Sequence, residues 1–599
     1  MANFNSKNML SNAHTTKPLV LDFFHRASDF FGQAARRVLA LSLAGTLALS
    51  TAGCGVAQGE TASTASDGQE ISQVVDQAST NELATSSDAF DASELFSDRD
   101  LESGYETAGA TSIELKSTGS VVSGSGATAD GSTVTITAEG VYILSGEISD
   151  GRVVVDAGEE AKVQLVLDGA SITSSTATAV YVKSADKVFV TTAGKSTNTI
   201  AATGAATEED EHTLDGTVFA CDDLTINGSG TLTVTSTAGN GVVGKDEVTL
   251  TGGTLNVTAA GHAIQANDSV AVAGGSYKLE AGTDGIHVSN DDDVQLGYLY
   301  IADGTIEVIA KSDGIDAAND FQIDGGSFSI TAGDDGIHSD AELIINGGTI
   351  DVAQSTEGLE GAQVTVNGGE TNVVASDDGV NATGDGADTA SETVTMDMDV
   401  AGSEAAPQEG MQQAMGGRRM GQSQDMGGMG EGGMPQGGMG GMGGGMRGGM
   451  GGGMMDSDAT AVLTIRGGSL AVDSGGDGLD SNGTLVVEGG ETYVNGPTNN
   501  GNGALDCGIS STVTGGTLIA IGSSGMAQSF GNDSTQGSIL ATANGSAGDV
   551  VEIVDEAGNV LASMTASKSY ACVIATAQGM EAGGTYTLRC GSESMQVTA

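Results

Sequence analysis

Six short acidic segments recur along this 599-residue chain, each with the pattern acid, glycine, aliphatic residue, polar residue. They begin at Asp284, Asp313, Asp335, Glu357, Asp378 and Asp477. Two carboxylates about 5 Å apart, at an effective dielectric near 20, repel each other by roughly 3 kcal/mol. Among lysines and arginines, only Lys245, Lys278 and Lys311 lie between Gly239 and Thr389. A divalent cation is therefore the predicted counter-charge, and an all-oxygen donor set favours Ca²⁺.

Glycine pairs return about every 22 residues between these segments, as at Gly325-Gly326, Gly347-Gly348 and Gly368-Gly369. The runs beside them, such as Leu343-Ile344-Ile345 and Thr349–Val352, are strand-like by alternation and β-branching. A period in this range indicates a solenoid of small stacked units. Each repeat is predicted to be a strand, a glycine turn, a strand and an acidic turn, forming one coil of an all-β parallel β-helix.

Stacked coils place equivalent strands about 4.8 Å apart, so equivalent residues form columns. The acidic tetrapeptides should therefore align. We expect their aliphatic third residue to enter the core and their glycine to permit a turn with positive φ. The first and fourth residues should face outward at one edge, giving two columns of acids.

A solvated turn is the alternative interpretation of each segment, because Asp and Gly are common in turns for backbone reasons alone. The aligned series, with further acids at Asp334, Asp340 and Asp377, favours calcium. The spacing matches neither an EF-hand loop nor the nonapeptide of calcium β-rolls. The remaining polar residues near these turns include three histidines, which we interpret as surface turn residues rather than transition-metal ligands. They are His262, His287 and His338.

The charge balance limits the possible partners. The chain has 79 acidic and 21 basic residues, a formal net charge of −58. Such a surface repels nucleic acids and anionic lipid headgroups. We therefore expect no nucleic-acid partner.

The first 53 residues are predicted to be a signal peptide, because Arg36-Arg37 precede an apolar run, Val38–Ser50, that is too short for a permanent membrane span. Small residues directly before Cys54 resemble a bacterial lipobox. We expect Cys54 to carry lipid and to anchor an extracytoplasmic, cell-surface lipoprotein, with this anchor as its membrane contact. An ordinary secretory signal with a chance cysteine is the alternative.

The remaining chain divides by composition. Residues 54–107 are rich in Ser, Thr, Ala and acids and are predicted to be a flexible tether. The β-helix is predicted over 108–530, with a disordered Gly/Met-rich insertion at 401–455. A small β-sandwich-like domain is predicted over 531–599, where Cys572 and Cys590 are candidates for a disulfide.

Three segments carry a resemblance to a known family: Gly140–Gly146, Asp222–Leu232 and Asp334–Asn381. From about residue 110 onward the chain resembles bacterial carbohydrate-binding domain proteins, which are calcium-binding right-handed parallel β-helices, some of them binding cellulose or pectin-like acidic polysaccharide. The resemblance implies a polysaccharide partner and Ca²⁺ in the acidic turns. Carried over to this chain, the implied ligands are Asp313, Asp316, Asp334, Asp335, Glu357, Glu360, Asp377, Asp378, Asn381, Asp477 and Asp480.

Three functions follow from these observations. The first is a non-enzymatic surface lipoprotein that binds polysaccharide with Ca²⁺ in its acidic turns. The second is a structural or adhesive stalk in which the ions only hold the coils together. The third is a calcium-dependent polysaccharide lyase, for which Lys311 and Arg466 are the candidate bases near the acidic turns.

Overall fold

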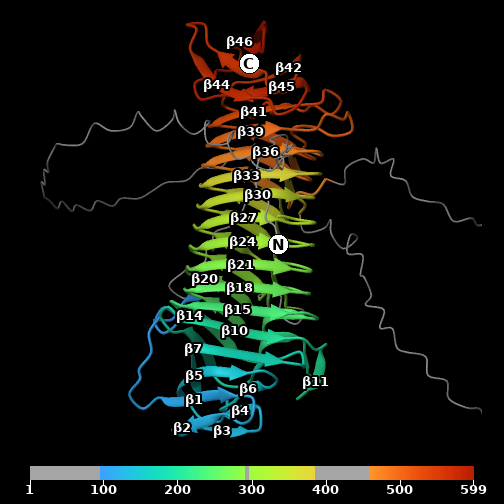
Figure 1. Ribbon diagram of the computed structural model, residues 1–599. Coiled ribbons are helices and arrows are strands. Elements are labelled where there is room, and N and C mark those ends of the chain that lie inside the picture. The colour runs from blue at the N-terminus through green and yellow to red at the C-terminus, as the bar shows by residue number, and fades with distance from the viewer. Residues whose placement is uncertain (1–94, 291–295, 385–456) are drawn as a thin grey trace, which may run out of the picture. The chain divides into compact units, whose positions relative to one another are not determined.

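The computed structural model describes residues 95–290, 296–384 and 457–599. Every element defined within these residues is a β-strand, which confirms the predicted all-β class. Figure 1 shows the strands stacked one above another from β1 toward β41, with chain order following the stack. In the described part of the chain, no helix has the length and apolar character needed to cross a bilayer.

One coil shows how the sequence repeat becomes structure. It contains β26 (Phe321–Ile323), β27 (Ser327–Thr331) and β28 (Ile337–Ser339). Each strand pairs in parallel with its equivalent 22 residues later, as Phe321 does with Leu343, Ser327 with Thr349 and Ile337 with Leu359. The 22-residue period is therefore one coil. Each coil has three strands rather than the predicted two, because the acidic tetrapeptide itself runs into a short third strand.

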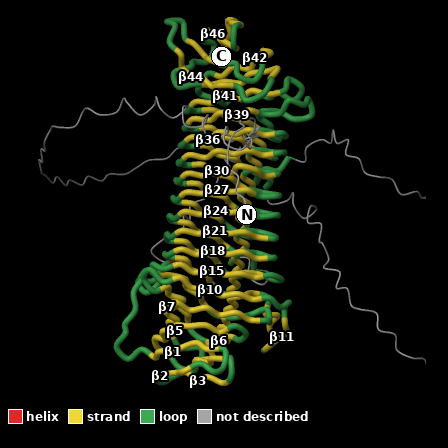
Figure 2. Tube along the Cα trace, viewed as in Figure 1, coloured by secondary structure: helices red, strands yellow, loops and turns green. Residues whose placement is uncertain are grey.

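The equivalent strands form three parallel ladders, which Figure 2 shows as successive yellow segments joined by green turns. The first ladder contains β9 (Lys187–Thr192), β14 (Asp223–Gly228), β17 (Glu247–Leu250), β20 (Ser269–Val272), β23 (Tyr298–Ile301), β26, β29 (Glu342–Ile345), β32 (Gln363–Val366), β35 (Val462–Ile465), β38 (Thr484–Val487) and β40 (Ser510–Val513). The second contains β10 (Thr197–Ala202), β15 (Thr231–Ser236), β18 (Thr254–Ala259), β21 (Ser276–Ala281), β24 (Thr305–Ile309), β27, β30 (Thr349–Ser355), β33 (Glu370–Ala375), β36 (Ser469–Ser474), β39 (Glu491–Asn495) and β41 (Thr517–Gly522). The third contains β4 (Thr133–Ile136), β6 (Arg152–Asp156), β8 (Val180–Ser184), β13 (Gly216–Ala220), β16 (Asn240–Gly244), β19 (Ile264–Ala266), β22 (Ile286–Val288), β25 (Ile315–Ala317), β28, β31 (Leu359–Gly361), β34 (Val380–Ala382) and β37 (Leu479–Ser481).

The two ends of the stack depart from this pattern. Two long strands, β5 (Gly140–Ile148) and β7 (Lys162–Ser174), run through both the first and second ladders and join them into one sheet. The remaining N-terminal strands are β1 (Thr111–Lys116), β2 (Val121–Ser123), β3 (Ala127–Asp130), β11 (Thr207–Glu209) and β12 (His212–Leu214). Pairing turns antiparallel at β1–β2, β3–β4 and, at the other end, β41–β45, so the parallel stack is closed at both ends.

The C-terminal strands lie where the sequence predicts them. They are β42 (Ser538–Gly545), β43 (Val550–Val554), β44 (Val560–Thr565), β45 (Tyr570–Thr576), β46 (Thr585–Cys590) and β47 (Glu593–Thr598). Strands β43, β44, β46 and β47 form a separate four-stranded sheet, whereas β42 and β45 extend the large sheet.

The disulfide considered between Cys572 and Cys590 is absent, and both residues are free thiols. Cys572 packs into the core of the stack, whereas Cys590 packs into the separate C-terminal core. Adjacent strand-like runs in the sequence therefore do not bring the two sulfur atoms together. Cys221 and Cys507 are half-buried free thiols.

The stack is filled by the aliphatic residues of the repeats. The third tetrapeptide residues, such as Ile315, Ile337 and Leu359, are fully buried in one continuous core. Their prediction as core residues is confirmed. Because side chains alternate along a strand, burying the third residue fixes the orientation of the fourth.

The last residues of the predicted tether are packed against the first ladder. Asp100 is 1% exposed, and its carboxylate accepts hydrogen bonds from Thr225 Oγ1 at 2.5 Å and from Ser97 Oγ at 2.6 Å. Lys187 Nζ lies 3.1 Å from the same carboxylate. The tether prediction is therefore wrong for this stretch, which we call the strap (residues 97–104), because a short polar segment lacks the periodicity that reveals packing.

Several predictions lie outside the described residues. They are the signal peptide, the lipidated Cys54 and the Gly/Met-rich insertion at 401–455. Around the insertion the ladders continue: Val380 of β34 pairs directly with Leu479 of β37, 99 residues later.

Candidate metal centre

The acidic tetrapeptides stack in register, as the sequence predicts. Their fourth residues are direct neighbours in the third ladder, where His287 pairs with Asp316 and Asp316 with His338. The same ladder later pairs Asn381 with both Glu360 and Asp480. We call these residues the fourth-position column, and the residues three positions earlier the first-position column.

The first-position column is tied together by its own carboxylates. Asp284 Oδ1 accepts the backbone N–H of Asp313 at 3.0 Å, and Asp313 Oδ1 accepts that of Asp335 at 2.8 Å. Asp378 and Asp477 accept the N–H of the following coil in the same way. One oxygen of each carboxylate thus holds the next turn, and the second oxygen is left for another partner.

Three carboxylates with no basic neighbour gather at the C-terminal part of the columns. Asp378, Asp477 and Asp480 each offer an oxygen within 4.8 Å of the others. Asp477 and Asp480 are 9% and 8% exposed. Asp480 Oδ1 and Oδ1 of the adjacent Asn381 are buried without a hydrogen-bond partner. Unsatisfied buried oxygens are costly, and an all-oxygen donor set of this kind fits a hard cation such as Ca²⁺.

The electrostatics of this oxygen group also favour a cation. Burial and then the charges of Asp378, Asp477 and Asp506 raise the pKa of Asp480 to about 8. Burial and the neighbouring acids raise the pKa of Asp378 to about 7 and that of Asp477 to about 6. These side chains therefore meet a strong penalty for ionisation, which a bound cation would remove.

Histidines supply positive charge in the N-terminal part of the columns. Asp316 lies between two of them, with Oδ2 2.6 Å from His287 Nδ1 and Oδ1 2.8 Å from His338 Nδ1. Burial would raise the pKa of Asp316, but these two hydrogen bonds and charges outweigh it and lower that pKa. Burial would lower the pKa of His338, but Asp316 and the acids Glu360 and Asp340 raise it. The expectation that these histidines are surface turn residues is wrong: the side chains of His262, His287 and His338 are only 22%, 23% and 19% exposed.

The structure brings together most of the predicted ligands, but not all of them. Asp313 and Asp316 group with Asp284, and Asp335 and Glu360 group with His338. Asp334 and Asp377 are exposed and belong to no such group in the described residues. Glu357 Oε2 instead accepts a hydrogen bond from Asn381 Nδ2 at 2.9 Å.

From the sequence, Asp284 belongs to the acidic series, but neither Asp284 nor the histidines are assigned as ligands. His287 is the fourth residue of the segment that begins at Asp284. Aligning the repeats one coil further back also places His262 in the first-position column, because that position is fixed by the same period.

Known proteins match the part of the chain that contains the N-terminal part of the two columns. Residues 130–385 match the family model described as "Carbohydrate-binding domain-containing protein". This segment is similar to that family. A curated relative of the same description from Acetivibrio thermocellus is 39% identical over 130 residues, 21% of this chain and 45% of the relative. The chain therefore spans less than half the length of the curated relative that it matches.

One solved structure also matches part of the chain. It is described as the polysaccharide lyase-like protein from C. thermocellum, in a gadolinium derivative. The sequence identity is 31%, and the match covers 41% of this chain and 97% of that one, with a TM-score of 0.37.

The segment matched by the family model contains the columns from Asp284 to Asn381, and it ends before Asp477 and Asp480. Of the candidate lyase bases, Lys311 is exposed and lies two residues before Asp313. Arg466 Nε lies 3.1 Å from Glu488 Oε2, so its guanidinium is already engaged in an ion pair.

The tetrapeptide glycines are needed for space rather than for positive φ. The left-handed conformation occurs instead at the second glycine of each pair, as at Gly326 with φ 99° and Gly348 with φ 92°. A Cβ on Gly358 would lie 2.1 Å from Val373 Cγ1 and 2.3 Å from the Gly379 carbonyl oxygen. The expectation of positive φ in the acidic turns is therefore wrong; each of these glycines instead allows the next coil to approach closely.

Gly358→Ala is expected to destabilise the protein by about 1–3 kcal/mol, since overpacking against backbone forces the coils apart. Gly274→Ala is the matched control, because a Cβ there has no atom within 4 Å and the residue is not in the positive-φ region. Thermal melting followed by circular dichroism compares the two. Equal melting temperatures for both variants would contradict the close-packing explanation.

Proposed function

We propose that this chain is a cell-surface lipoprotein that binds polysaccharide, with Ca²⁺ held in the stacked acidic turns of a right-handed parallel β-helix. The carbohydrate part of the proposal is supported by the family match over residues 130–385. The calcium part is supported by the group of Asp378, Asp477 and Asp480, together with the unpartnered oxygens of Asn381 and Asp480. The group of unpaired buried oxygens carries the proposal, because a bound cation would pair with these oxygens whatever the glycan is.

Calcium would also reconcile the protein's charge with an acidic glycan. A chain with a formal net charge of −58 repels a polyuronate. Ca²⁺ accepts six to eight oxygen ligands and keeps positions open for carboxylates of a second molecule. An ion at the edge of the columns would therefore bridge protein and uronate, and it would not be required for a neutral glucan. The absence of tryptophan argues against a broad aromatic platform for crystalline cellulose.

The test is depletion of a glycan panel by the immobilised protein, with polygalacturonate and cellulose assayed in calcium and in chelator. We expect polygalacturonate to be depleted only in calcium, with no shortening of the glycan chains. No depletion of any glycan would favour the structural stalk. Shortened chains with unsaturated ends would favour a lyase, and loss of that activity in Lys311→Ala would identify its base.

A further inference from the structure

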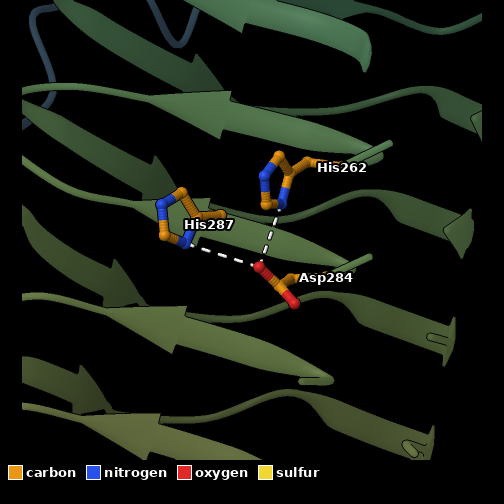
Figure 3. Close-up of side chains that lie close together, drawn as sticks. All are labelled: His262, Asp284 and His287. Carbon is orange, nitrogen blue, oxygen red and sulfur yellow. Dashed lines mark ion pairs between the residues drawn. The ribbon is translucent and has the colours of Figure 1, made fainter. Parts of the chain in front are cut away.

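Two histidines and an aspartate from successive coils form a group that differs in chemistry from the oxygen group. His262 precedes β19, and Asp284 and His287 flank the start of β22. Figure 3 shows both imidazole rings turned toward the Asp284 carboxylate. Asp284 Oδ2 lies 3.0 Å from His262 Nδ1 and 3.5 Å from His287 Nδ1, and the three ligand atoms lie within 4.8 Å of one another.

The surroundings hold all three side chains in this orientation. The N–H of Asp313 occupies Asp284 Oδ1, which leaves Oδ2 between the two rings. His287 Nε2 lies 3.0 Å from Ser289 Oγ, and the backbone N–H of His262 donates to Asn240 Oδ1 at 2.9 Å. Outer hydrogen bonds of this kind fix ring tautomers and orient imidazole ligands toward a metal.

The contacts of the two rings leave one ring nitrogen without a partner. The two rings are stacked, with centroids 4.6 Å apart and an interplanar angle of 18°. His262 Nδ1 is buried, and its contact with Asp284 lacks hydrogen-bond geometry, so this nitrogen has no hydrogen-bond partner. A metal ion bound at the Nδ1 edges of the two rings, beside Asp284 Oδ2, would satisfy that nitrogen.

We propose that His262 Nδ1, Asp284 Oδ2 and His287 Nδ1 bind a late first-row divalent transition metal ion, with Zn²⁺ as the reference ion. Imidazole nitrogen suits Zn²⁺, Cu²⁺ and Ni²⁺, whereas Ca²⁺ takes oxygen ligands. The site is therefore separate in specificity from the proposed calcium group, which lies in later coils.

Binding has one chemical requirement. His287 Nδ1 lies 2.6 Å from Asp316 Oδ2, so a proton shared in that contact must leave for solvent when the metal takes the nitrogen lone pair. Three protein ligands leave at least one coordination position for water or for a ligand oxygen.

The test is titration of the full chain with Zn²⁺ by calorimetry, in excess Ca²⁺ so that oxygen sites are filled. We expect one high-affinity equivalent that weakens by at least about 10-fold in His262→Ala. His212→Ala is the matched control, because His212 lies on β12 beside Phe219 and should leave this equivalent unchanged. Identical isotherms for the wild type and His262→Ala, or absence of the high-affinity equivalent in the wild type, would overturn the proposal.

A spectroscopic experiment provides a second readout that separates loss of the metal site from misfolding of a variant. Co²⁺ added to the wild-type chain should give visible d–d bands typical of mixed nitrogen and oxygen ligation, and Asp284→Asn should change them. Melting in chelator checks that every variant is folded. Bands that are the same in the wild type, His262→Ala and Asp284→Asn would place the metal elsewhere. The result is independent of glycan binding, so it stands or falls separately from the proposed function.

Discussion

Asp480→Asn is expected to stabilise the protein in chelator and to reduce its stabilisation by calcium. Without a cation, the buried Asp480 carboxylate faces Asp378 and Asp477, and its pKa is raised to about 8. Neutralising it should raise the free energy of unfolding at pH 7 by about 2–4 kcal/mol, since each pKa unit corresponds to about 1.4 kcal/mol. With calcium this advantage is largely offset, because the variant loses a ligand oxygen that carries charge. A site filled at about 100 times its Kd contributes about 2.7 kcal/mol.

The measurement is thermal melting of both proteins in calcium and in chelator, and calcium should raise the melting temperature of the wild type more than that of Asp480→Asn. Asp377→Asn is the control, because Asp377 is exposed, lies next to Asp378 and belongs to no metal group in the described residues. If Asp480→Asn lowered the melting temperature equally in both solutions, the calcium assignment at this group would fail.

The pH dependence of the calcium-free protein follows from the same group. The pKa values of Asp480, Asp378 and Asp477 are raised to about 8, 7 and 6. Since the folded state holds these protons more tightly than the unfolded state, stability should fall as pH rises from about 4 to 8. Melting in chelator at pH 5.5 and pH 8.5 checks this, and Asp480→Asn should flatten the slope. A flat profile for the wild type would show that these carboxylates ionise without penalty.

Asp100→Asn is expected to detach the strap and to cost about 3 kcal/mol locally. The change leaves Lys187, whose side chain is 11% exposed, without the nearer of its two carboxylate neighbours. Removing one partner of a buried ion pair leaves the other charge buried without compensation, which lowers stability more than the loss of an exposed pair does. Hydrogen exchange at residues 97–104 and at β14 is the direct readout, because stability in a stacked fold is local to neighbouring coils.

Asp98→Asn is the matched control, since Asp98 is exposed and lies two residues away. In the wild type, hydrogen bonds from Ser97 and Thr225 and the charge of Lys187 outweigh burial and lower the pKa of Asp100. The strap is therefore held at pH above the ordinary value of 3.8 and should loosen as pH falls through the lowered pKa. Equal exchange rates in Asp98→Asn and Asp100→Asn would mean that the strap is not held by this carboxylate.

The sequence by itself determined the repeat. The period is 22 residues, and each repeat has a buried aliphatic residue at the same place. Only one register of strand pairing between coils keeps these residues buried, because a slip by one residue would turn Ile315 or Ile337 out of the core. The alignment of Asp316 with its neighbours in the fourth-position column follows directly from that register. The strands at the C-terminal end could also be predicted from the sequence, since alternation and β-branching are local signals.

Only the tertiary structure decided which groups share a site. The contact of His262 with Asp284 and His287 joins the first position of one coil to both polar positions of the next, and it depends on side-chain orientation. The strap's contact with β9 and β14, and the separation of Cys572 from Cys590 into two cores, join segments that no period relates. The glycine of each acidic turn shows the same limit. The sequence shows that the residue is glycine. The reason that it must be glycine is the backbone carbonyl oxygen of the next coil, which stacking places too close for a Cβ atom.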